Sequence, residues 1–346
     1  MKLLLILLGQ LIFCSPSFGL SRSSRDELHR YTLMRDRIIV ERSIKDLGRN
    51  NYFMTDFHFS SGLIAFTGEV DNIVDNPNLN DAEKQSQVQS ILSKHANTGK
   101  YADLENAISI PLPEIKHNKY HFYPTVFVSH NISGSMSVSS DEDFKAFIKK
   151  DLKYGLYSYI TVGSQFMIES SLYQLKRKEL YTTKTSSQIV GDRKLANARG
   201  LGQEQSSIRI DFKISKKYKM ITTSLKIEEF VLIKDSTTNN YKNSFFIDGR
   251  LNGVFKNSEF SYSPFIGMHR RERYSLFKGL YVGTKIDRHD FPIKGMFILD
   301  GEILTLSFSA EYRWLNAGYT VKLPHQNPVD NTWVSKIHSL MISVPF

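Results

Sequence analysis

Few residues of this chain are spaced so that they could carry out a reaction. His338 lies between Ser335 and Ser339, but in an extended strand it projects from the face opposite to both serines, beyond the reach that a nucleophile and its base require. The acid and histidine cluster Asp287–Asp290 falls on a short connection between predicted strands. The sequence holds no His-Glu-x-x-His, no Gly-x-Ser-x-Gly and no glycine-rich phosphate loop. We therefore expect no enzyme, no cofactor and no metal ion.

Charged residues that alternate with apolar ones are more informative. In the stretch from Ile208 to Ile214, every second residue is apolar and the residues between them are charged, which is the period of a strand with two different faces. In a barrel, the charged face would line the lumen, which is then either a hydrated channel or an ion-paired, closed interior. The alternation does not separate these two states. The predicted lumen charges are Arg209, Asp211, Lys213, Asp248, Arg250, Glu311 and Arg313.

The longest predicted loop, residues 176–205, is strongly basic. If it faces the outside of a cell, it would meet the phosphates of lipopolysaccharide or another anionic ligand; a merely solvated loop is the alternative. A second basic tip, His269–Arg273, has the same two interpretations. The basic residues that we assign to the long loop are Lys176, Arg177, Lys178, Arg193, Lys194 and Arg199.

The elements that would position these charges are strands. From residue 119 to the end of the chain, apolar residues recur at every second position, and short polar turns such as Asp300-Gly301 and Lys256–Ser258 separate the runs. We count about 12 strands (range 10 to 14), most of them near the length that crosses a bilayer at a tilt. The sequence thus predicts an all-β fold, a transmembrane antiparallel β-barrel over residues 119–346.

The preceding segment, residues 20–118, differs in its periodicity. A helix is predicted over Asn78–His95, because Asn80 can cap it and Glu83 follows three residues later. Tyr101–Ala107 is predicted as a second short helical turn, and Ser140–Leu152 as an amphipathic helix at the barrel rim. We expect residues 20–118 to form a periplasmic cap, a plug in the barrel mouth, or a lead-in that packs on the barrel base.

The N-terminus and the charge bound the cellular location. Residues 1–19 combine Lys2, an apolar run and the small residues Ser17 and Gly19, which predicts a cleaved secretory signal peptide. Cleavage after Gly19 would remove Cys14, the only cysteine, and no later stretch is long and apolar enough for a membrane-spanning helix. The net charge of +10 would suggest nucleic acid for a cytosolic protein, but export argues against that partner.

The C-terminal residues Leu340, Ile342, Val344 and Phe346 share one parity, and the sequence stops at the aromatic residue. On these residues, the signal peptide and the strand array, the chain resembles Gram-negative outer-membrane β-barrel proteins. The resemblance implies an outer-membrane location and recognition by the barrel-assembly machinery. The plan of a helical N-terminal segment before the barrel also looks like the fatty-acid transporter class and the TraF-like conjugal-transfer barrels. Asn76-Pro77 is a short match to an N-terminal motif of these proteins.

These features favour a non-enzymatic channel or transporter for small molecules. The alternative is a closed barrel that binds lipopolysaccharide or a protein partner without transporting anything, and a barrel enzyme acting on lipid or peptide is the third reading. The substrate and the oligomeric state stay open.

Overall fold

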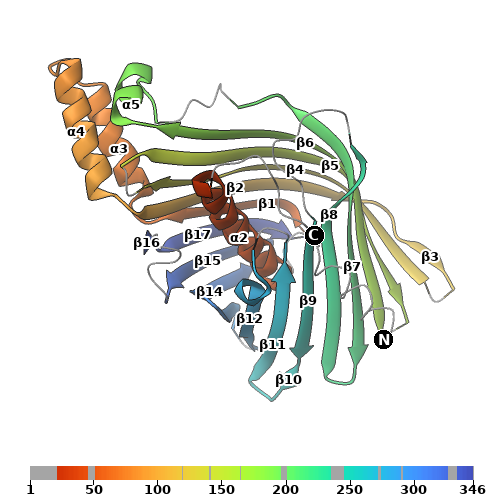
Figure 1. The fold of residues 1–346 in the computed structure, drawn as a ribbon. Helices are drawn as coiled ribbons and strands as arrows, with labels where there is room; N and C mark the ends of the chain where they lie inside the picture. The colour runs from red at the N-terminus through yellow and green to blue at the C-terminus, as the bar shows by residue number, and fades with distance from the viewer. Residues whose placement is uncertain are drawn as a thin grey trace.

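The chain forms a closed barrel of fourteen antiparallel strands around a 24-residue helix (Figure 1). The computed structural model describes residues 22–45, 51–118, 120–139, 142–163, 165–195, 201–234, 245–271, 274–289, 291–325 and 333–345. Each strand pairs with the next along the wall, and the barrel closes because β1 (Asn51–Ser60) pairs with β17 (Ile337–Pro345).

The other wall strands follow in chain order: β2 (Thr98–Pro111), β4 (Tyr120–Val138), β5 (Phe144–Val162), β6 (Phe166–Lys184), β7 (Gln205–Tyr218), β8 (Ile221–Lys234), β9 (Phe246–Gly253), β11 (Phe260–Arg270), β12 (Leu280–Arg288), β13 (Ile293–Asp300), β14 (Ile303–Tyr312) and β15 (Leu315–Pro324). Three short strands extend this wall at its edges: β3 (Ile115–His117), β10 (Phe255–Lys256) and β16 (Trp333–Val334).

The wall starts earlier in the chain than predicted. β1 and β2 lie before residue 119, so the predicted boundary at that residue is wrong and the expected count of about 12 strands is too low. Tyr101–Ala107, predicted as a helical turn, lies in β2, and most of Ser140–Leu152, predicted as a helix, belongs to β5. β5 pairs along its whole length with a strand on each side, and such pairing overrides a local helical pattern.

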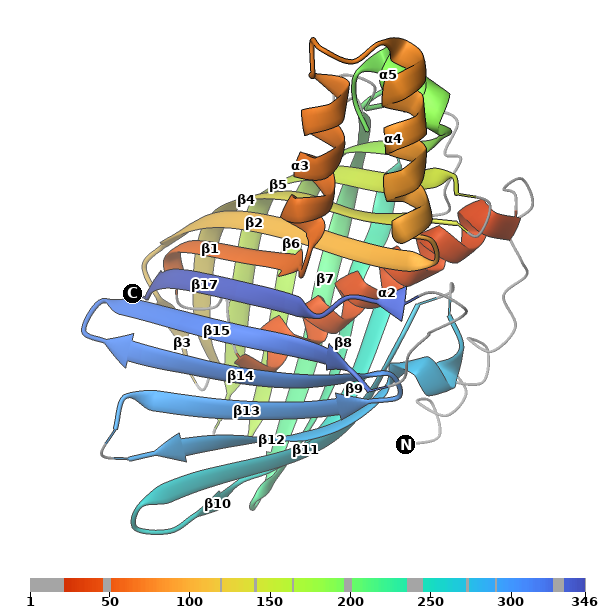
Figure 2. The same ribbon diagram turned by 90° about the vertical axis from the view of Figure 1, so that its left-hand side faces the viewer.

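Three helices stand together beyond one end of the barrel: α3 (Leu63–Val74), α4 (Asp81–Lys94) and α5 (Ser186–Asp192) (Figure 2). We call this group the crown. The predicted cap of α4 is confirmed, because the Asn80 side chain accepts from the Glu83 amide and the Glu83 carboxylate accepts from the Asn80 amide, both at 2.9 Å. One apolar core joins the crown to the ends of β4 and β5; it is built from Phe66, Val70, Val74, Val88, Leu92, Ile189 and Val190 of the crown and Val138, Phe144 and Ala146 of the wall.

The connections differ in length between the two barrel ends. At the crown end lie the long ones, between β6 and β7, between β8 and β9, and between β15 and β17. At the opposite end, where β17 finishes, lie the short turns after Tyr218, Lys256 and Tyr312. We call this opposite end the C-terminal end. Counting strands back from the last one in the sequence predicts the same division, with residues 176–205, 234–243 and 324–332 at one end and residues 215–219, 256–258 and 315–317 at the other.

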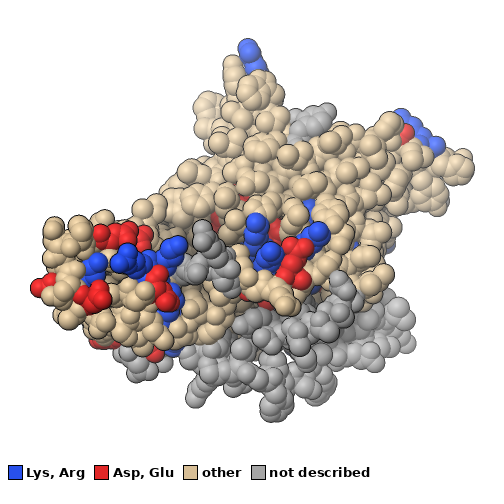
Figure 3. All heavy atoms as spheres, turned by 90° about the horizontal axis from the view of Figure 1, so that it is seen from above, with Lys and Arg blue, Asp and Glu red and all other residues tan. Residues whose placement is uncertain are grey.

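The wall has one apolar face and one polar face. Large apolar side chains such as Leu172 and Ile266 point outward and are exposed, whereas Ser133, Asp151 and Thr320 point inward and are buried. In Figure 3, most of the described surface on the side in view is neither acidic nor basic, and the charged side chains gather in separate groups, one of them over the crown. Among the described residues, no helix is long and apolar enough to cross a membrane.

A charge on the outward face should destabilise the barrel. Leu172, which lies opposite Leu156 on the neighbouring strand, is half exposed on this face. We expect Leu172→Arg to lower the free energy of unfolding by about 2–4 kcal/mol in lipid vesicles, measured by denaturant titration, because the cation would face hydrocarbon. The matched change Ile64→Arg, on the exposed surface of the crown, should have little effect. Equal losses in the two variants would contradict an apolar belt on the wall.

Candidate functional site: the helix in the lumen

The helix α2 (Arg22–Lys45) runs through the lumen and contacts the wall on many sides (Figures 1 and 2). Tyr31 Oη lies 2.6 Å from Ser133 Oγ in the crown half of β4. Near the other end of the helix, Lys285 Nζ donates to the Ile44 carbonyl at 3.1 Å, close to the C-terminal end of the barrel. The helix therefore runs from the crown end toward the C-terminal end, where β1 begins.

Apolar contacts fix one stripe of α2 against the wall. Leu28, Tyr31, Met34 and Ile38 pack with wall residues that include Phe147. Further along the helix, a second cluster unites Val40 and Ile44 with Phe246, Phe265, Tyr281, Met296 and Ile298. Burying these side chains stabilises the helix inside the barrel, at about 1.5–3 kcal/mol for each large one that leaves water completely.

The remaining faces of α2 carry charges, and the wall carries opposite ones. Arg37 donates to Glu302 at 2.8 Å, and the Arg271 guanidinium approaches Asp36 Oδ1 at 2.9 Å. Lower in the lumen, Glu41 pairs with Lys322. An ion cannot leave water cheaply unless a partner and hydrogen bonds replace its hydration, so the match between helix and wall is required for α2 to lie there.

Arg42 forms the densest contact between helix and wall. Its guanidinium reaches Asp56 at 2.7 Å and Asp103 at 3.2 Å, and it also bonds to Glu105. His58 Nε2 lies 3.0 Å from the same Asp56 carboxylate. Three carboxylates of β1 and β2 therefore converge on one helix cation, and these are the two strands that the sequence prediction placed outside the wall.

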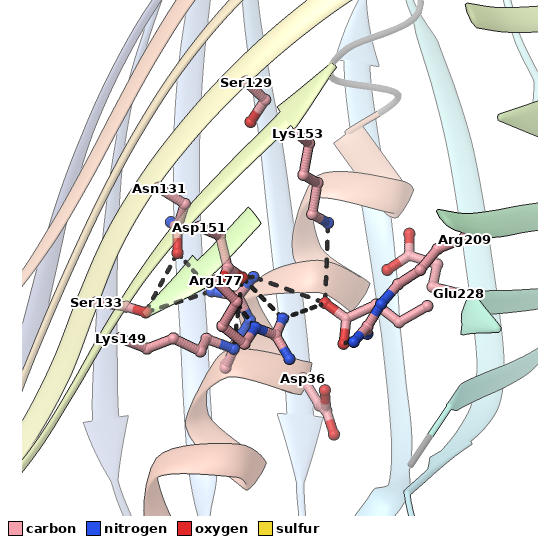
Figure 4. Close-up of polar contacts among 12 residues, drawn as sticks. Asp36, Ser129, Asn131, Ser133, Lys149, Asp151, Lys153, Arg177, Arg209 and Glu228 are labelled. Carbon is pink, nitrogen blue, oxygen red and sulfur yellow. Dashed lines mark hydrogen bonds and ion pairs between the residues drawn. The ribbon is translucent and has the colours of Figure 1, made fainter. Parts of the chain in front are cut away.

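In the middle of the lumen, the carboxylate of Glu229 is the shared partner of several cations. Arg271 lies 3.2 Å from it, Arg177 3.3 Å, Arg209 3.5 Å and Lys153 3.8 Å. Arg35 of α2 lies 3.9 Å away. Arg177 and Arg209 point toward this centre from neighbouring strands in Figure 4. Glu229 is only 3% exposed, so this one anion compensates a group of buried cations.

A second buried anion, Asp151 of β5, completes this network. Arg177 binds it in a two-pronged manner, with Nε to Oδ1 at 2.7 Å and Nη2 to Oδ2 at 2.8 Å. Lys149, labelled in Figure 4, approaches the same carboxylate at 3.7 Å, and Arg35 approaches it at 3.4 Å. A bidentate pair of this kind has both strength and a fixed geometry, which orients Arg177 toward Glu229.

A β-bulge brings Glu229 into the lumen. The register of β7 and β8 shifts so that Glu228 and Glu229 both lie opposite Asp211. Glu229 has a φ of 59°, and its amide donates to Asp211 Oδ1 at 2.7 Å. Sequence reasoning did not single out Glu229. The sequence does contain a sign of the bulge. Glu228 and Glu229 are adjacent, and in a regular strand one of their carboxylates would point to the apolar face.

Five of the seven predicted lumen charges lie inside the barrel. Glu311 and Arg313 do not: Glu311 pairs with Lys294 at 2.7 Å and is half exposed at the C-terminal rim, and Arg313 lies in the turn after β14 with a φ of 51°. Apolar and polar residues alternate to the last residues of β14, but these residues lie beyond the buried part of the lumen. The alternation alone therefore assigned Glu311 and Arg313 to the lumen wrongly. The inward residues are Arg209, Asp211, Lys213, Asp248 and Arg250.

The predicted basic loop is bounded wrongly. Lys176, Arg177 and Lys178 lie in β6, a strand of 19 residues, and Arg177 points into the lumen. Lys176 and Lys178 both approach Glu204, at 3.6 and 3.9 Å. Further along, Arg193 ends α5, the Lys194 carbonyl accepts from Lys184, and Arg199 lies outside the described residues.

The described residues of the second predicted basic tip, 269–271, are not all solvated. Arg271 is buried against Asp36, and His269 lies 2.6 Å from the Tyr274 hydroxyl. Tyr274 in turn donates to Asp36 at 2.9 Å. Burial, together with the Asp36 carboxylate, holds the pKa of the Tyr274 phenol well above its usual range. This tip therefore fastens the crown end of the barrel to α2.

The predicted assembly signal lies on the closing strand. Leu340 and Ile342 are half exposed on the outward face of β17, and Val344 is partly buried. Phe346 and the predicted signal peptide of residues 1–19 lie outside the described residues.

The predicted pairing of His338 with Ser335 or Ser339 is not formed. His338 contacts Ser61 and Tyr319, at 3.1 and 2.6 Å, rather than the serines beside it in the sequence. Among the described residues, no group of three or more His, Asp or Glu side chains could hold a metal ion. The paired charges of the lumen hold α2 against the wall.

Comparisons with solved structures return barrels of low similarity. The transport unit of the autotransporter AIDA-I from Escherichia coli is 9% identical with a TM-score of 0.46, covering 94% of this chain and 99% of that one. The translocator domain of the autotransporter NalP from Neisseria meningitidis has a TM-score of 0.40 at 9% identity, with the same coverage. A Pseudomonas aeruginosa FadL homologue has a TM-score of 0.30 at 8% identity, covering 72% of this chain and 68% of that one. No family model and no curated protein matches the chain.

Removing the central anion should weaken the whole lumen. We expect Glu229→Gln to lower the free energy of unfolding by about 3–5 kcal/mol, because several buried cations would lose their shared carboxylate. Denaturant titration in detergent measures this change. Glu311→Gln removes the same charge at the exposed rim and should cost about 0.5 kcal/mol or less. If the two variants were equally stable, the lumenal network would not hold the barrel together.

Proposed function

We propose that this protein is an outer-membrane β-barrel that acts as a channel or transporter for small molecules, with α2 as its gate. A closed barrel pairs every wall strand on both edges, which is what hydrocarbon demands of a backbone. The apolar outward face and the polar lumen fit the same environment. The proposal includes no reaction, and lipopolysaccharide and the barrel-assembly machinery are its expected partners.

The position of α2 is the observation that carries this proposal. A barrel of about eight strands is filled by its own side chains, so fourteen strands enclose a wider lumen that something else must fill. A cavity of about 320 Å³ lies at the crown end, between α2 residues such as Leu33 and wall residues such as Tyr101. Another, of about 230 Å³, lies beside Ile44 at the other end of the helix. The helix thus separates two hollow vestibules.

The nature of the contacts supports a gate that can be displaced. Buried ion pairs repay only part of the cost of desolvating their charges, and a wet lumen could rehydrate them if the helix moved. The apolar stripe through Tyr31 and Ile38 is what keeps the closed state favoured at rest. A displaced α2 would leave a lumen with charges of both signs, which suits small polar solutes.

Planar-bilayer recording of the refolded protein tests the gate. Arg42→Glu would place a fourth carboxylate against Asp56, Asp103 and Glu105, which should expel the lower half of α2. We expect the wild type to be silent or to open rarely, and the variant to show frequent single-channel steps. Lys116→Glu makes the same charge change at an exposed site and should behave like the wild type.

Two results would contradict the gate. Steady channels in the wild type would mean that α2 does not close the lumen. A folded Arg42→Glu barrel, shown by heat-modifiable migration on a gel, that stays silent across a range of voltages would mean that α2 is not displaceable.

The crown favours a second candidate function, the binding of a surface partner. Ile64 of α3 and Phe277 in the 3₁₀ turn η2 (Leu276–Gly279) are 73% and 75% exposed at the crown end, where the long connections also lie. Large apolar residues exposed at the same end of the barrel suit a protein or lipopolysaccharide partner.

A photo-crosslinker placed in intact cells tests this second function. At Ile64 or Phe277 it should give a discrete adduct, and at Phe291, exposed at the C-terminal end, it should not. Identical patterns at all three positions would remove this candidate.

A further inference from the structure

The vestibule at the C-terminal end of α2 has an unusual lining. Its cavity of about 230 Å³ is bounded by Ile44 of the helix and by side chains of six wall strands. Three of these side chains are cationic, and none is a carboxylate. The polar residues on which the argument depends are Lys213, Arg250, Lys285, Ser215, Ser224 and Ser263.

Arg250 is buried without enough partners. Its side chain is 7% exposed, and its Nε and Nη1 atoms donate no hydrogen bond. Its Nη2 makes one long hydrogen bond, to the Ser43 carbonyl at 3.5 Å. Among the described residues, no carboxylate lies within ion-pair distance of it; Asp248, two residues earlier on β9, interacts with its charge from farther away and accepts from the Tyr281 hydroxyl at 2.6 Å. A buried guanidinium with unmet donors costs free energy that only an acceptor in the cavity could recover.

The two lysines of the cavity differ in their partners. Lys213 Nζ pairs with Glu169 at 2.9 Å. Lys285 Nζ donates to the Ile44 carbonyl, a neutral acceptor, and forms no ion pair in the described part of the chain. Arg250 and Lys285 both contact the last carbonyls of α2, which explains why cations are favourable there. It does not explain the two donors of Arg250 that nothing accepts.

We propose that this cavity binds a small tetrahedral oxyanion of the phosphate class, either inorganic phosphate or a phosphomonoester. Two cations that form no close ion pair in the described part of the chain match the charge of a phosphate at neutral pH, and the serine hydroxyls supply further donors for its remaining oxygens. A carboxylate has only two oxygens and would leave most of these donors unused. The site requires α2 to lie where it does here, because Ile44 bounds the cavity, but it does not require the barrel to conduct.

Calorimetric titration tests the site on the refolded full chain in an uncharged detergent. Inorganic phosphate and glycerol 3-phosphate are titrated separately, and binding of either at one per barrel supports the proposal. Arg250→Gln should weaken that binding about tenfold or more, the loss expected for a hydrogen bond to a charged group. Arg288→Gln removes one cation from the exposed rim at the same end and should bind as the wild type does.

A second variant tests the site by thermal stability, so that the test does not depend on how tightly phosphate binds. It introduces a carboxylate next to Arg250 in place of the phosphate. Ser224 lies directly opposite Arg250 in the pairing of β8 with β9, so Ser224→Asp would place a carboxylate beside the guanidinium. We expect this variant to melt at a higher temperature than the wild type without phosphate, and to gain nothing from phosphate. Where Arg250→Gln does not fold, Lys285→Gln takes its place in the titration.

Three outcomes would overturn the proposal. One is a wild type that binds neither anion. Another is an equal loss of binding in Arg250→Gln and Arg288→Gln, which would show a diffuse charge effect. The third is a Ser224→Asp barrel that is less stable than the wild type and still responds to phosphate.

Discussion

The structure depends on the pairing of buried charges between α2 and the inner wall. Glu229, Asp151 and the carboxylates around Arg42 each compensate cations that could not stay in the lumen alone. Because each carboxylate has partners on more than one element, the network ties the helix to strands on several sides of the barrel. The wall and the helix therefore form one structure, rather than a shell with a loose insert.

The two faces of the wall have different surroundings, an apolar one outside and a polar one inside. Its outward face is apolar along its strands, and its inward face has the polarity of a protein–water boundary. Strict alternation achieves this as long as each strand is regular. Where more than one charge is needed on the inside, as at Glu228 and Glu229, the backbone breaks the alternation with a bulge and a positive φ. The strained residue is thus also the centre of the charge network.

Period-two alternation predicted the barrel, its long connections at one end and most of its inward charges, because these features are local. The cap of α4 was predictable for the same reason. α2 was not predictable, because nearly all of its faces are buried. Its charges have their wall partners only in the folded barrel, at separations from 14 residues for Arg42 and Asp56 to 281 residues for Glu41 and Lys322. β1 and β2 were not assigned to the wall because helices separate them, and the predicted loop 176–205 began inside β6 because this strand continues beyond the belt of exposed apolar residues.

The seam between β1 and β17 joins the two strands that are farthest apart in the chain, and α2 ends just before β1. Pairing so distant in sequence is slow to form. Until it forms, the lumen is open along one side and its ions are still hydrated. If α2 enters while the seam is open, the folding barrier combines loop closure with ion desolvation.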